Sequence, residues 1–443
     1  MTDLLIRNGT VVTTGGPREA DVAIENGVIS GVGQGLGGAR AEIDARGLAL
    51  LPGVIDVHLH FNEPGRTEWE GAATGSRAFA AGGGTLFFDM PLNSTPCTVT
   101  ARDVQLKRSA LEAASIADFA LWGGLIPGSI SSMEEMAAAG VVGFKAFMSN
   151  SGLPEFPRSD DATLLEGMRE AARLGLPVAV HAENEELTAR LAGRMAGRGV
   201  RDFLLSRPVI AELDAIQRAL LFAEETGAAL HIVHISSGRG VAMAAAAQAR
   251  GVNVSMETCA HYLFFTEEDM ERLGAVAKCA PPLRPGAEQD RLWTELLAGR
   301  VDIVASDHSP SEPRLKQGDF LSAWGGIAGV QSTLAVMLDR GHHQRQIPLE
   351  RVASLLASTP ARRFRIAGKG QLAAGFDADI ALVDLDESFT LETSDLHQRH
   401  KMSPYVGHRF RGRVKSTIRR GATIFADGRI IGETKGRFVR PVT

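Results

Sequence analysis

The chain has 443 residues, of which 44% are hydrophobic and 22% charged, and its formal net charge is -5. These values are typical of a globular protein, and the length allows either about three average domains or one α/β barrel with an accessory domain. Because the net charge is small and negative, the composition gives no reason to expect a nucleic acid or an anionic membrane as a partner.

Two further features concern the compartment. The opening residues 1–7 are too polar for a signal peptide, and the sequence contains no run of about 18 apolar residues. The three cysteines, Cys97, Cys259 and Cys279, are too few and too scattered for a disulfide framework or a cysteine-based zinc site. We therefore expect a cytoplasmic protein with no membrane contact.

The first part of the chain predicts β-strands. Residues 4–12 carry β-branched side chains around an Asn-Gly turn signal at Asn8. Residues 21–29 repeat this pattern as a hairpin around Asn26.

The other end of the chain has the same character. Residues 417–424 resemble the opening segment, residues 426–431 form an Asp-Gly hairpin, and residues 379–383 predict one more strand. Short strands at both termini predict one composite β-sandwich domain, made from residues 1–52 and 368–443.

Between these ends, residues 53–367 alternate short apolar runs with segments of helical period. Such alternation is typical of buried parallel strands covered by helices. The eight runs predicted as strands are 54–60, 85–90, 118–123, 141–147, 177–182, 230–235, 253–259 and 302–306. The amphipathic stretches between them include 74–81, 101–114, 211–225 and 288–297. Eight β/α units over about 300 residues predict an α/β fold of the (β/α)8 TIM-barrel type.

Five side chains with metal-binding chemistry fall at the ends of predicted barrel strands. His58 and His60 end the first strand and lie two residues apart, so they share a face. His181 ends the fifth strand, His234 lies near the end of the sixth, and Asp307 follows the eighth. Because the carboxyl ends of barrel strands meet at one face, we expect these side chains to converge on one site. Four imidazoles and a carboxylate suit zinc or a similar divalent metal.

Each histidine also has a purely structural interpretation, because a single histidine is more often a structural residue than a ligand. The parity of the sixth strand separates two candidates. His231 precedes His234 by three residues, so in a regular strand the two face opposite sides. Only one of them would then enter the barrel, and we interpret His231 as the structural one.

Lys145 lies inside the fourth predicted strand, where a buried ammonium group is costly. In one interpretation its side chain reaches the surface or pairs with an acid. In the other, burial lowers its pKa, and the neutral amine reacts with carbon dioxide. The resulting carbamate is an anion with two oxygens that can bridge two metal ions. The residue chemistry permits both interpretations.

Several longer motifs accompany these residues. They are Asp-Val-His-Leu-His at 56–60, Gly-Phe-Lys-Ala-Phe at 143–147, His-Ala-Glu-Asn at 181–184, His-Ile-Ser-Ser at 234–237, Lys-Cys-Ala-Pro-Pro-Leu-Arg at 278–284, Ser-Asp-His-Ser-Pro at 306–310 and His-Lys-Met-Ser-Pro-Tyr at 400–405. Four more are Glu-Pro-Gly-Arg at 63–66, Trp-Glu-Gly at 69–71, Met-Pro-Leu-Asn at 90–93 and Trp-Gly-Gly-Ile-Ala-Gly at 324–329. With these motifs the chain resembles, over nearly its whole length, the cyclic amidohydrolases of the amidohydrolase superfamily. The last four motifs make it most similar to the allantoinase family.

The resemblance implies a site with two divalent metal ions. The implied ligands are His58, His60 and Asp307 for one ion, His181 and His234 for the other, and a carboxylated Lys145 as the bridge. Zinc is the expected metal, and iron, manganese, cobalt and nickel also suit these ligands. Two such ions lower the pKa of a shared water, which gives a bridging hydroxide that attacks a ring carbonyl. Asp307 would carry the proton to the leaving ring nitrogen.

Asn62 helps to predict whether the substrate carries a charge. Dihydroorotases resemble this chain but carry an arginine at that position, and a neutral amide cannot form the bidentate pair that a substrate carboxylate needs. An uncharged ring is therefore favoured, and the implied reaction is hydrolysis of allantoin to allantoate. Hydantoinases and dihydropyrimidinases, which lack the Glu-Pro-Gly-Arg and Trp-Glu-Gly motifs, are the alternative. The candidate substrate contacts are Asn62, Asn93, Ser149, Asn150, Ala280 and Gly325, of which the polar ones also suit turns and caps.

The resemblance also concerns partners. Tetramers are common among the relatives, so we expect a homo-oligomer that binds a small cyclic amide or ureide. Some members of the superfamily have lost metal ligands and serve as non-catalytic partner-binding proteins, whereas this chain keeps all six ligand positions. Residues 149–160 contain a glycine and two prolines and predict either a lid or a long loop.

Overall fold

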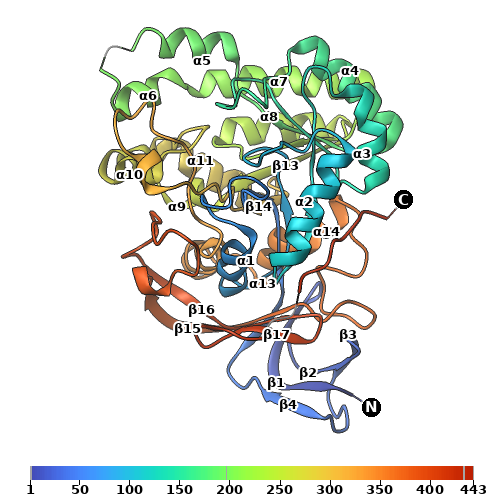
Figure 1. Cartoon of the computed structure of the whole chain (residues 1–443). Coiled ribbons are helices and arrows are strands. Elements are labelled where there is room, and N and C mark those ends of the chain that lie inside the picture. Colours follow the sequence, from blue (N-terminus) through green and yellow to red (C-terminus); the bar gives the residue numbers. More distant parts are fainter. Residues whose placement is uncertain (1, 196, 433–434, 443) are drawn as a thin grey trace.

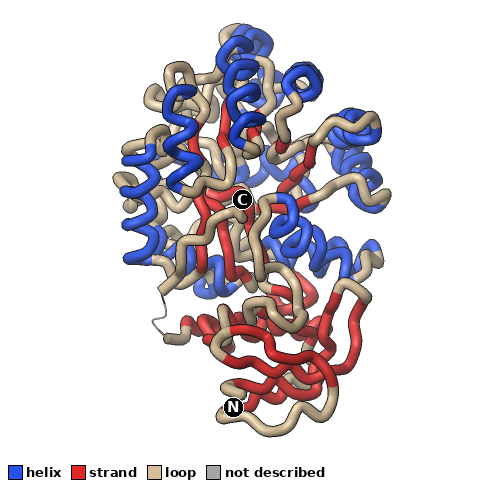
Figure 2. The backbone as a smooth tube through the Cα atoms, turned by 90° about the vertical axis from the view of Figure 1, so that its right-hand side faces the viewer, coloured by secondary structure: helices blue, strands red, loops and turns tan. Residues whose placement is uncertain are grey.

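The computed structural model describes residues 2–195, 197–432 and 435–442. It contains a barrel of parallel strands surrounded by helices and, below it in Figure 1, a mostly antiparallel sheet. The blue strands from the start of the chain and the red strands from its end lie together in this second sheet (Figure 1). In Figure 2, turned by 90°, its strands again gather beneath the helix-covered barrel.

The barrel contains every strand that the apolar runs predict. Its strands are β6 (Val54–Leu59), β7 (Gly84–Asp89), β8 (Asp118–Leu121), β9 (Gly123–Gly124), β10 (Phe144–Phe147), β11 (Val178–His181), β12 (Leu230–Ile232), β13 (Val254–Cys259) and β14 (Ile303–Ala305). Neighbours pair in parallel from β6 to β8 and from β9 to β14. A parallel bridge between Leu59 and His308 connects the two ends of this series. The predicted TIM-barrel class is confirmed.

Helices cover the outside of the barrel. They are α1 (Ala72–Ala81), α2 (Ala101–Ala114), α3 (Met133–Ala139), α4 (Asp161–Leu174), α5 (Glu185–Ala192), α6 (Val200–Ser206), α7 (Val209–Thr226), α8 (Gly238–Ala249), α9 (Ala260–Phe264), α10 (Glu267–Leu273), α11 (Gly286–Leu297), α12 (Thr333–Val336), α13 (Leu349–Ala353) and α14 (Thr359–Arg363). Helix α2 begins at a capping box, because Thr100 and Asp103 satisfy each other's backbone N–H groups. None of the helices in the described part of the chain is long and apolar enough to span a membrane.

The second sheet joins the two ends of the chain. Its strands are β1 (Leu4–Thr13), β2 (Gly16–Glu25), β3 (Val28–Gly33), β4 (Ala41–Asp44), β5 (Ala49–Pro52), β15 (Ile380–Thr390), β16 (Arg409–Arg419), β17 (Ala422–Ala426) and β18 (Arg429–Ile430). Strand β15 pairs antiparallel with β5, which places Leu382 opposite Leu50. Both leucines, with Ile6, Ile24 and Ile418, lie in one buried cluster. This pairing fuses the N-terminal and C-terminal strands into one unit, as the sequence predicted.

One turn signal has a different role in the structure. Asn26 forms the turn between β2 and β3 as predicted, but Asn8 lies within β1, which runs on to Thr13. The β1–β2 register shifts between Ile6 and Gly9, so the Asn-Gly pair makes a β-bulge. Asn8 adopts a φ of 60°, and the space beside Gly9 is filled by the side chain of Leu50. The bulge therefore favours an Asn-Gly pair for the same reason as a turn does, because both need residues that tolerate a positive φ.

The interior of the barrel is filled below the strand ends. Trp122, which interrupts the strand between β8 and β9, is fully buried, and its indole N–H donates to the carbonyl of Val57 at 3.0 Å. Phe88 and Ile303 pack in the same cluster, whereas their neighbours along the strands pack outward against the helices. The barrel is thus a packed core, and its open end lies at the strand carboxyl termini.

A buried ionic cluster joins the barrel to the sheet domain. Lys369 donates from Nζ to Asp118 at 2.8 Å and to Asp379 at 2.6 Å, and it lies 2.8 Å from Asp377. Arg419 donates to Asp118 at 3.0 Å. Asp118 begins β8 in the barrel, while the other residues belong to the sheet domain or the segment leading into it. The three carboxylates surround an ammonium group, so this cluster of acids is already neutralised by the chain itself.

Substituting Asp118 by alanine tests this junction. The substitution leaves Lys369 and Arg419 buried with one partner fewer, so we expect a loss of about 3–5 kcal/mol in the free energy of unfolding. Urea unfolding followed by circular dichroism measures it. Asp386→Ala, which removes an exposed ion pair with Arg411, is the control and should change little. Equal stability of the two variants would contradict a structural role for the cluster.

Candidate metal centre and substrate pocket

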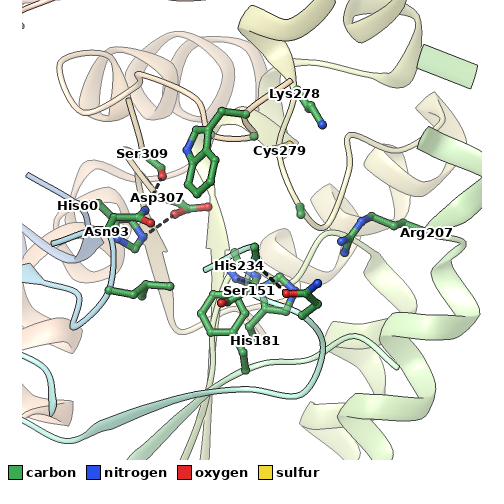
Figure 3. Close-up of a pocket in the computed structure, with 18 of the residues that line it drawn as sticks. His60, Asn93, Ser151, His181, Arg207, His234, Lys278, Cys279, Asp307 and Ser309 are labelled. Atoms are coloured by element: carbon green, nitrogen blue, oxygen red, sulfur yellow. Dashed lines mark hydrogen bonds and ion pairs between the residues drawn. The ribbon is translucent and has the colours of Figure 1, made fainter. Parts of the chain in front are cut away.

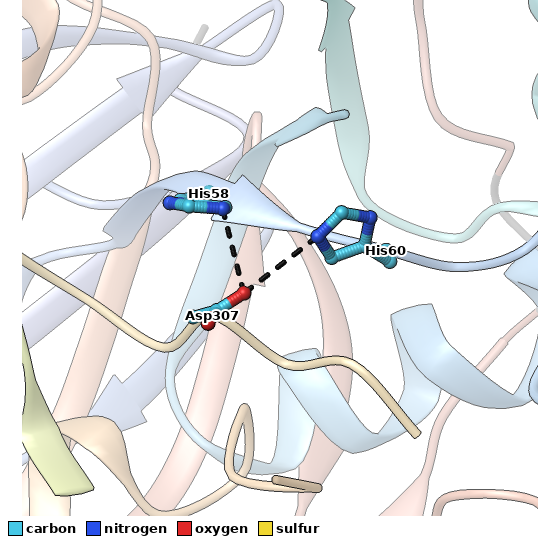
Figure 4. A group of neighbouring side chains, drawn as sticks. All are labelled: His58, His60 and Asp307. Atoms are coloured by element: carbon cyan, nitrogen blue, oxygen red, sulfur yellow. Dashed lines mark ion pairs between the residues drawn. The ribbon is translucent and has the colours of Figure 1, made fainter. Parts of the chain in front are cut away.

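The first group of predicted ligands converges at the end of β6. His58 Nε2 lies 3.4 Å and His60 Nε2 lies 3.6 Å from the same oxygen, Oδ1 of Asp307 (Figure 4). Asp307 follows β14 and is turned inward by a left-handed backbone conformation with a φ of 41°. All three side chains are buried. Their ligand atoms lie within 4.8 Å of one another, a spacing that suits coordination of one metal ion.

The second group lies across the barrel mouth. His181 ends β11, and its Nδ1 lies 3.0 Å from Nε2 of His234. Two nitrogens bound to one zinc ion at about 2.0–2.1 Å in tetrahedral geometry are separated by about 3.3 Å, so this pair has nearly the spacing of two ligands. Nδ1 of His234 is buried and has no partner among the described residues.

Lys145 lies between the two groups in the interior. Its side chain is fully buried, its Nζ has no hydrogen-bond partner in the described part of the chain, and the ring of Phe147 lies 5.1 Å away. Burial lowers the pKa of Lys145 to about 8, although the nearby carboxylates of Glu257 and Asp307 act in the opposite direction. The interpretation in which the lysine pairs with an acid or reaches the surface is therefore wrong. Burial without a partner favours the neutral form of this amine.

Two buried carboxylates orient the imidazoles from behind. Glu257 on β13 accepts from Nδ1 of His58 at 2.8 Å, and Glu183 accepts from Nε2 of His181 at 2.8 Å. Burial would raise the pKa of both acids, but nearby basic groups, chiefly Arg207 for Glu183 and His58 for Glu257, lower each pKa to about 2. An ionised carboxylate behind a histidine fixes the tautomer, which leaves the other ring nitrogen free to bind a metal.

Neither of these supporting carboxylates was predicted from the sequence. Glu183 lies in the His-Ala-Glu-Asn motif, two residues after His181, and Glu257 lies in a strand that is otherwise almost free of charge. A carboxylate inside a buried strand is unusual, and that signal could have identified Glu257. Arg207, which pairs with Glu183, follows α6 and gave no comparable signal.

The parity prediction for the sixth strand is wrong. His231 faces the interior, where it stacks on Trp122 with 6.3 Å between ring centroids and shares Glu257 with His58. His234 also enters the barrel mouth, because β12 ends at Ile232 and His234 adopts a φ of 39°. The regular alternation is broken between them, so both face inward. His231 holds Glu257 from below and keeps the structural role assigned to it.

The ligand groups lie at the base of a cavity of about 330 Å3 (Figure 3). Of the residues predicted as substrate contacts, Asn93, Asn150, Ala280 and Gly325 line this cavity. Asn62 and Ser149 are buried and are not among the lining residues; Asn62 donates to the carbonyl of Asn93 at 3.2 Å. The lining also includes residues that the sequence analysis did not single out, namely Phe147, Phe203, Arg207, Lys278 and Leu321.

His261 and His308 lie close behind the site, and both are fully buried. Burial lowers the pKa of His261 to about 4 and that of His308 to about 3, so both rings are neutral near pH 7. Nδ1 of His308 accepts from the backbone of Val330 at 3.4 Å, and its Nε2 lies 3.8 Å from Glu70. These contacts give His308 a place in the packing around Asp307.

The model of the amidohydrolase family matches residues 49–425. The chain belongs to this family. It is accordingly a metal-dependent cyclic amidohydrolase, and its candidate ligand groups occupy the end of the barrel where a TIM-barrel enzyme carries its active site.

Individual relatives match over the full length. The chain is 62% identical to a protein named allantoinase from Solibacter usitatus, with 100% of this chain and 97% of the relative covered. It is 58% identical to one from Rubrobacter xylanophilus, with 99% and 98% covered. Among solved structures, the L-hydantoinase (dihydropyrimidinase) from Arthrobacter aurescens superposes with a TM-score of 0.97 at 33% identity, covering 99% and 100%. A D-hydantoinase gives a TM-score of 0.92 at 32% identity, with 99% of each chain covered.

Substituting Glu257 by glutamine tests the support of His58. Glutamine keeps the shape but loses the charge, so it cannot accept from both His58 and His231. We expect the affinity for zinc to fall by about 10–100-fold, measured by competition with a chromophoric chelator. Glu170→Gln, which changes a partly exposed carboxylate paired with Arg173 on the outside of α4, is the control and should leave the affinity unchanged. An unchanged affinity in the Glu257 variant would show that the contact does not orient a ligand.

Proposed function

We propose that this enzyme hydrolyses allantoin to allantoate. The observation that carries the proposal is its full-length similarity to proteins named allantoinase, at 62%, 58% and 53% identity. The cavity agrees in character, because its wall combines amide and hydroxyl groups with main-chain segments around the ligand groups. Allantoin is an uncharged hydantoin ring with a ureido substituent, and such a molecule needs many donors and acceptors.

The residues present fit a pair of divalent metal ions. In the proposed arrangement one ion is held by His58, His60 and Asp307, and the other by His181 and His234. Support comes from the closely spaced ligand atoms of both groups and from the carboxylates behind the imidazoles. When bound, the two ions acidify a water molecule and polarise the ring carbonyl. Zinc is the proposed metal, since imidazole and carboxylate ligands suit it.

Lys145 is proposed to be carboxylated and to bridge the two ions. Its fully buried Nζ lacks a partner among the described residues, and its lowered pKa leaves more of the amine neutral at a given pH. A neutral amine adds to carbon dioxide and loses a proton, which gives a carbamate with one negative charge and two oxygens. That group would satisfy the lysine and could supply an oxygen ligand to each metal ion.

Asp307 is the proposed proton carrier. Burial alone would raise the pKa of Asp307, but His58 and His60 offset this effect and hold the pKa well below its usual range. The carboxylate therefore enters the reaction ionised and can take the proton of the attacking water. It then returns the proton to the ring nitrogen as the C–N bond breaks. Ring opening gives one product, allantoate: the former ring nitrogen becomes a ureido NH2 group, and the attacked carbon becomes a carboxylic acid that loses its proton to solvent.

The remaining wall would hold the ring and its substituent. Asn93 and Asn150 are proposed to pair with polar atoms of the substrate, and backbone groups near Ala280 and Gly325 to hold the ring. All four line the cavity. Asn62 and Ser149 are buried and do not line the cavity, so their proposed role is to hold the residues that contact the substrate.

The alternative function is hydrolysis of a hydantoin or dihydropyrimidine. The superposition on hydantoinases favours it, with TM-scores of 0.97 and 0.92. These structures are 33% and 32% identical to the chain, whereas the relatives named allantoinase reach 62%. Sequence similarity therefore ranks allantoin first.

We further propose that the enzyme works in the cytoplasm as a homotetramer, with a small cyclic ureide or amide as its ligand. The proposed domain boundaries place residues 53–367 in the catalytic barrel and residues 1–52 and 368–443 in the composite domain. The pairing of β5 with β15 supports this division.

A comparison of substrates tests the function. Zinc-loaded enzyme should turn over allantoin with a kcat/KM at least about tenfold above that for hydantoin, dihydrouracil or dihydroorotate, because only allantoin fills both the ring site and the lined wall. Ring opening is followed by loss of the ring absorbance and by chromatography of the product. A preference for hydantoin or dihydrouracil would replace the proposal by the alternative.

A second prediction concerns Asp307. In the Asp307→Asn variant the amide can still face a metal but cannot take a proton. We expect kcat to fall by about 10²–10⁴-fold while part of the bound metal is retained. Turnover and metal content are measured on the same sample, with Asp161→Asn on the surface of α4 as the control. Substantial activity in the Asp307 variant would exclude this residue as the proton carrier.

A further inference from the structure

The rim of the cavity is built by loops that follow three barrel strands. Residues 62–70 follow β6, residues 148–160 follow β10, and residues 308–326 follow β14. The second and third loops face the cavity directly. Their lining residues include Asn150, Ser151, Gly152, Trp324, Gly325 and Gly326.

A chain of contacts connects the second loop to the third through the first. Arg66 donates from Nη2 to Oε1 of Glu155, and its guanidinium lies over the ring of Trp69 at 5.0 Å. The ring of Trp69 meets that of Trp324 edge-on, with 4.9 Å between centroids and 69° between planes. We call these four residues the rim brace. Arg66 and Trp69 come from the Glu-Pro-Gly-Arg and Trp-Glu-Gly motifs, for which the catalytic site supplies no role.

The first loop is firmly anchored. Glu63 accepts from the backbone N–H of Ala72 at 2.7 Å, which caps the start of α1. Gly65 has a φ of 83° and packs so closely on the backbone of Thr95 that a side chain would not fit. Glu70 accepts from the backbone of Arg399 at 2.9 Å. This loop is therefore the fixed support against which the brace holds the other two.

The two lining loops also approach each other across the rim. A Cβ atom added at Gly152 would lie 3.9 Å from the indole of Trp324, so this glycine stands close to that ring. Arg66, Trp69 and Glu155 are not among the residues that line the cavity. They can set the separation of the two loops without touching the substrate.

We propose that the rim brace determines specificity, with Arg66 and Trp69 as positioning residues that hold the lining loops at the width required by a hydantoin ring with a planar polar substituent. The inference rests on the proposed function. The metal-facing residues act on the ring carbonyl, which every cyclic amide offers, so they cannot select the substituent. Selection of the substituent must therefore come from the cavity wall beyond the metal-facing residues, and the rim brace holds that wall in place.

The variants Trp69→Leu and Arg66→Met test the proposal. Each should raise the KM for allantoin by about tenfold, the size expected for losing an aromatic or cation–π contact. The kcat and the zinc content per chain should stay near wild type, because no ligand is disturbed. The kcat/KM for unsubstituted hydantoin should fall less than that for allantoin. Arg314→Met is the matched control: Arg314 lies on the third loop but pairs with Glu312 at an exposed position.

Two further variants distinguish the specific loss of rim-brace contacts from a general loosening of the rim loops. Arg66→Lys can keep the ion pair but cannot lie flat on Trp69, so its KM should fall between wild type and Arg66→Met. Adding Glu155→Gln to Arg66→Met should cause little further change, since the pair is already broken.

Equal losses for allantoin and hydantoin, an unchanged KM in folded Trp69→Leu, or a fall in zinc content or kcat in place of the rise in KM would each overturn the inference. Failure of the proposed function is seen separately, as absence of allantoin turnover by the wild type. The brace is then tested by the same comparison between substituted and plain hydantoins.

Discussion

Glu257 binds three of the groups that build the site. Its Oε1 accepts from Nδ1 of His58 at 2.8 Å and from the backbone N–H of His234 at 3.1 Å, and its Oε2 lies 3.1 Å from Nε2 of His231. The backbone at His234 is in the left-handed region, and an unpaired N–H there would be costly to bury. One carboxylate thus orients a candidate ligand from β6 and also stabilises the turn that presents a candidate ligand after β12. The shape of the site therefore depends on the negative charge of Glu257.

The charges around the imidazoles follow from this arrangement. A histidine binds a metal only when it is neutral. Burial lowers the pKa of His58, His181 and His234 below the usual value, so their lone pairs are available near neutral pH. Burial has the opposite effect on the carboxylates behind them, and for these acids the neighbouring basic groups prevail. The same buried end of the barrel therefore holds neutral imidazoles next to ionised acids.

Much of this fold could be predicted from the sequence because buried parallel strands leave a strong local signal. His58, His60, His181 and Asp307 adjoin such runs, so their convergence follows once the barrel is assumed. His234 shows the limit of prediction from local sequence. Its left-handed backbone reverses the parity of the strand, and no local sequence pattern predicts that conformation. The bulge at Asn8 and the contact between Arg66 and Glu155 depend on residues far along the chain. Local propensity contains no information about such contacts.

The stabilising contacts and the candidate site are found at opposite ends of the barrel. Asn62, Asn93, His234 and Asp307 all adopt φ values between 39° and 62°, and each lies at or just beyond the carboxyl end of a barrel strand. Such conformations are unfavourable for residues with a side chain, and they persist only where the surroundings enforce them. The ionic cluster at Asp118 and the sheet domain lie at the amino end of the strands, where packing and buried ion pairs hold the barrel together. With the frame fixed there, the other end can keep the strained turns that aim the candidate ligands and the loops that shape the cavity.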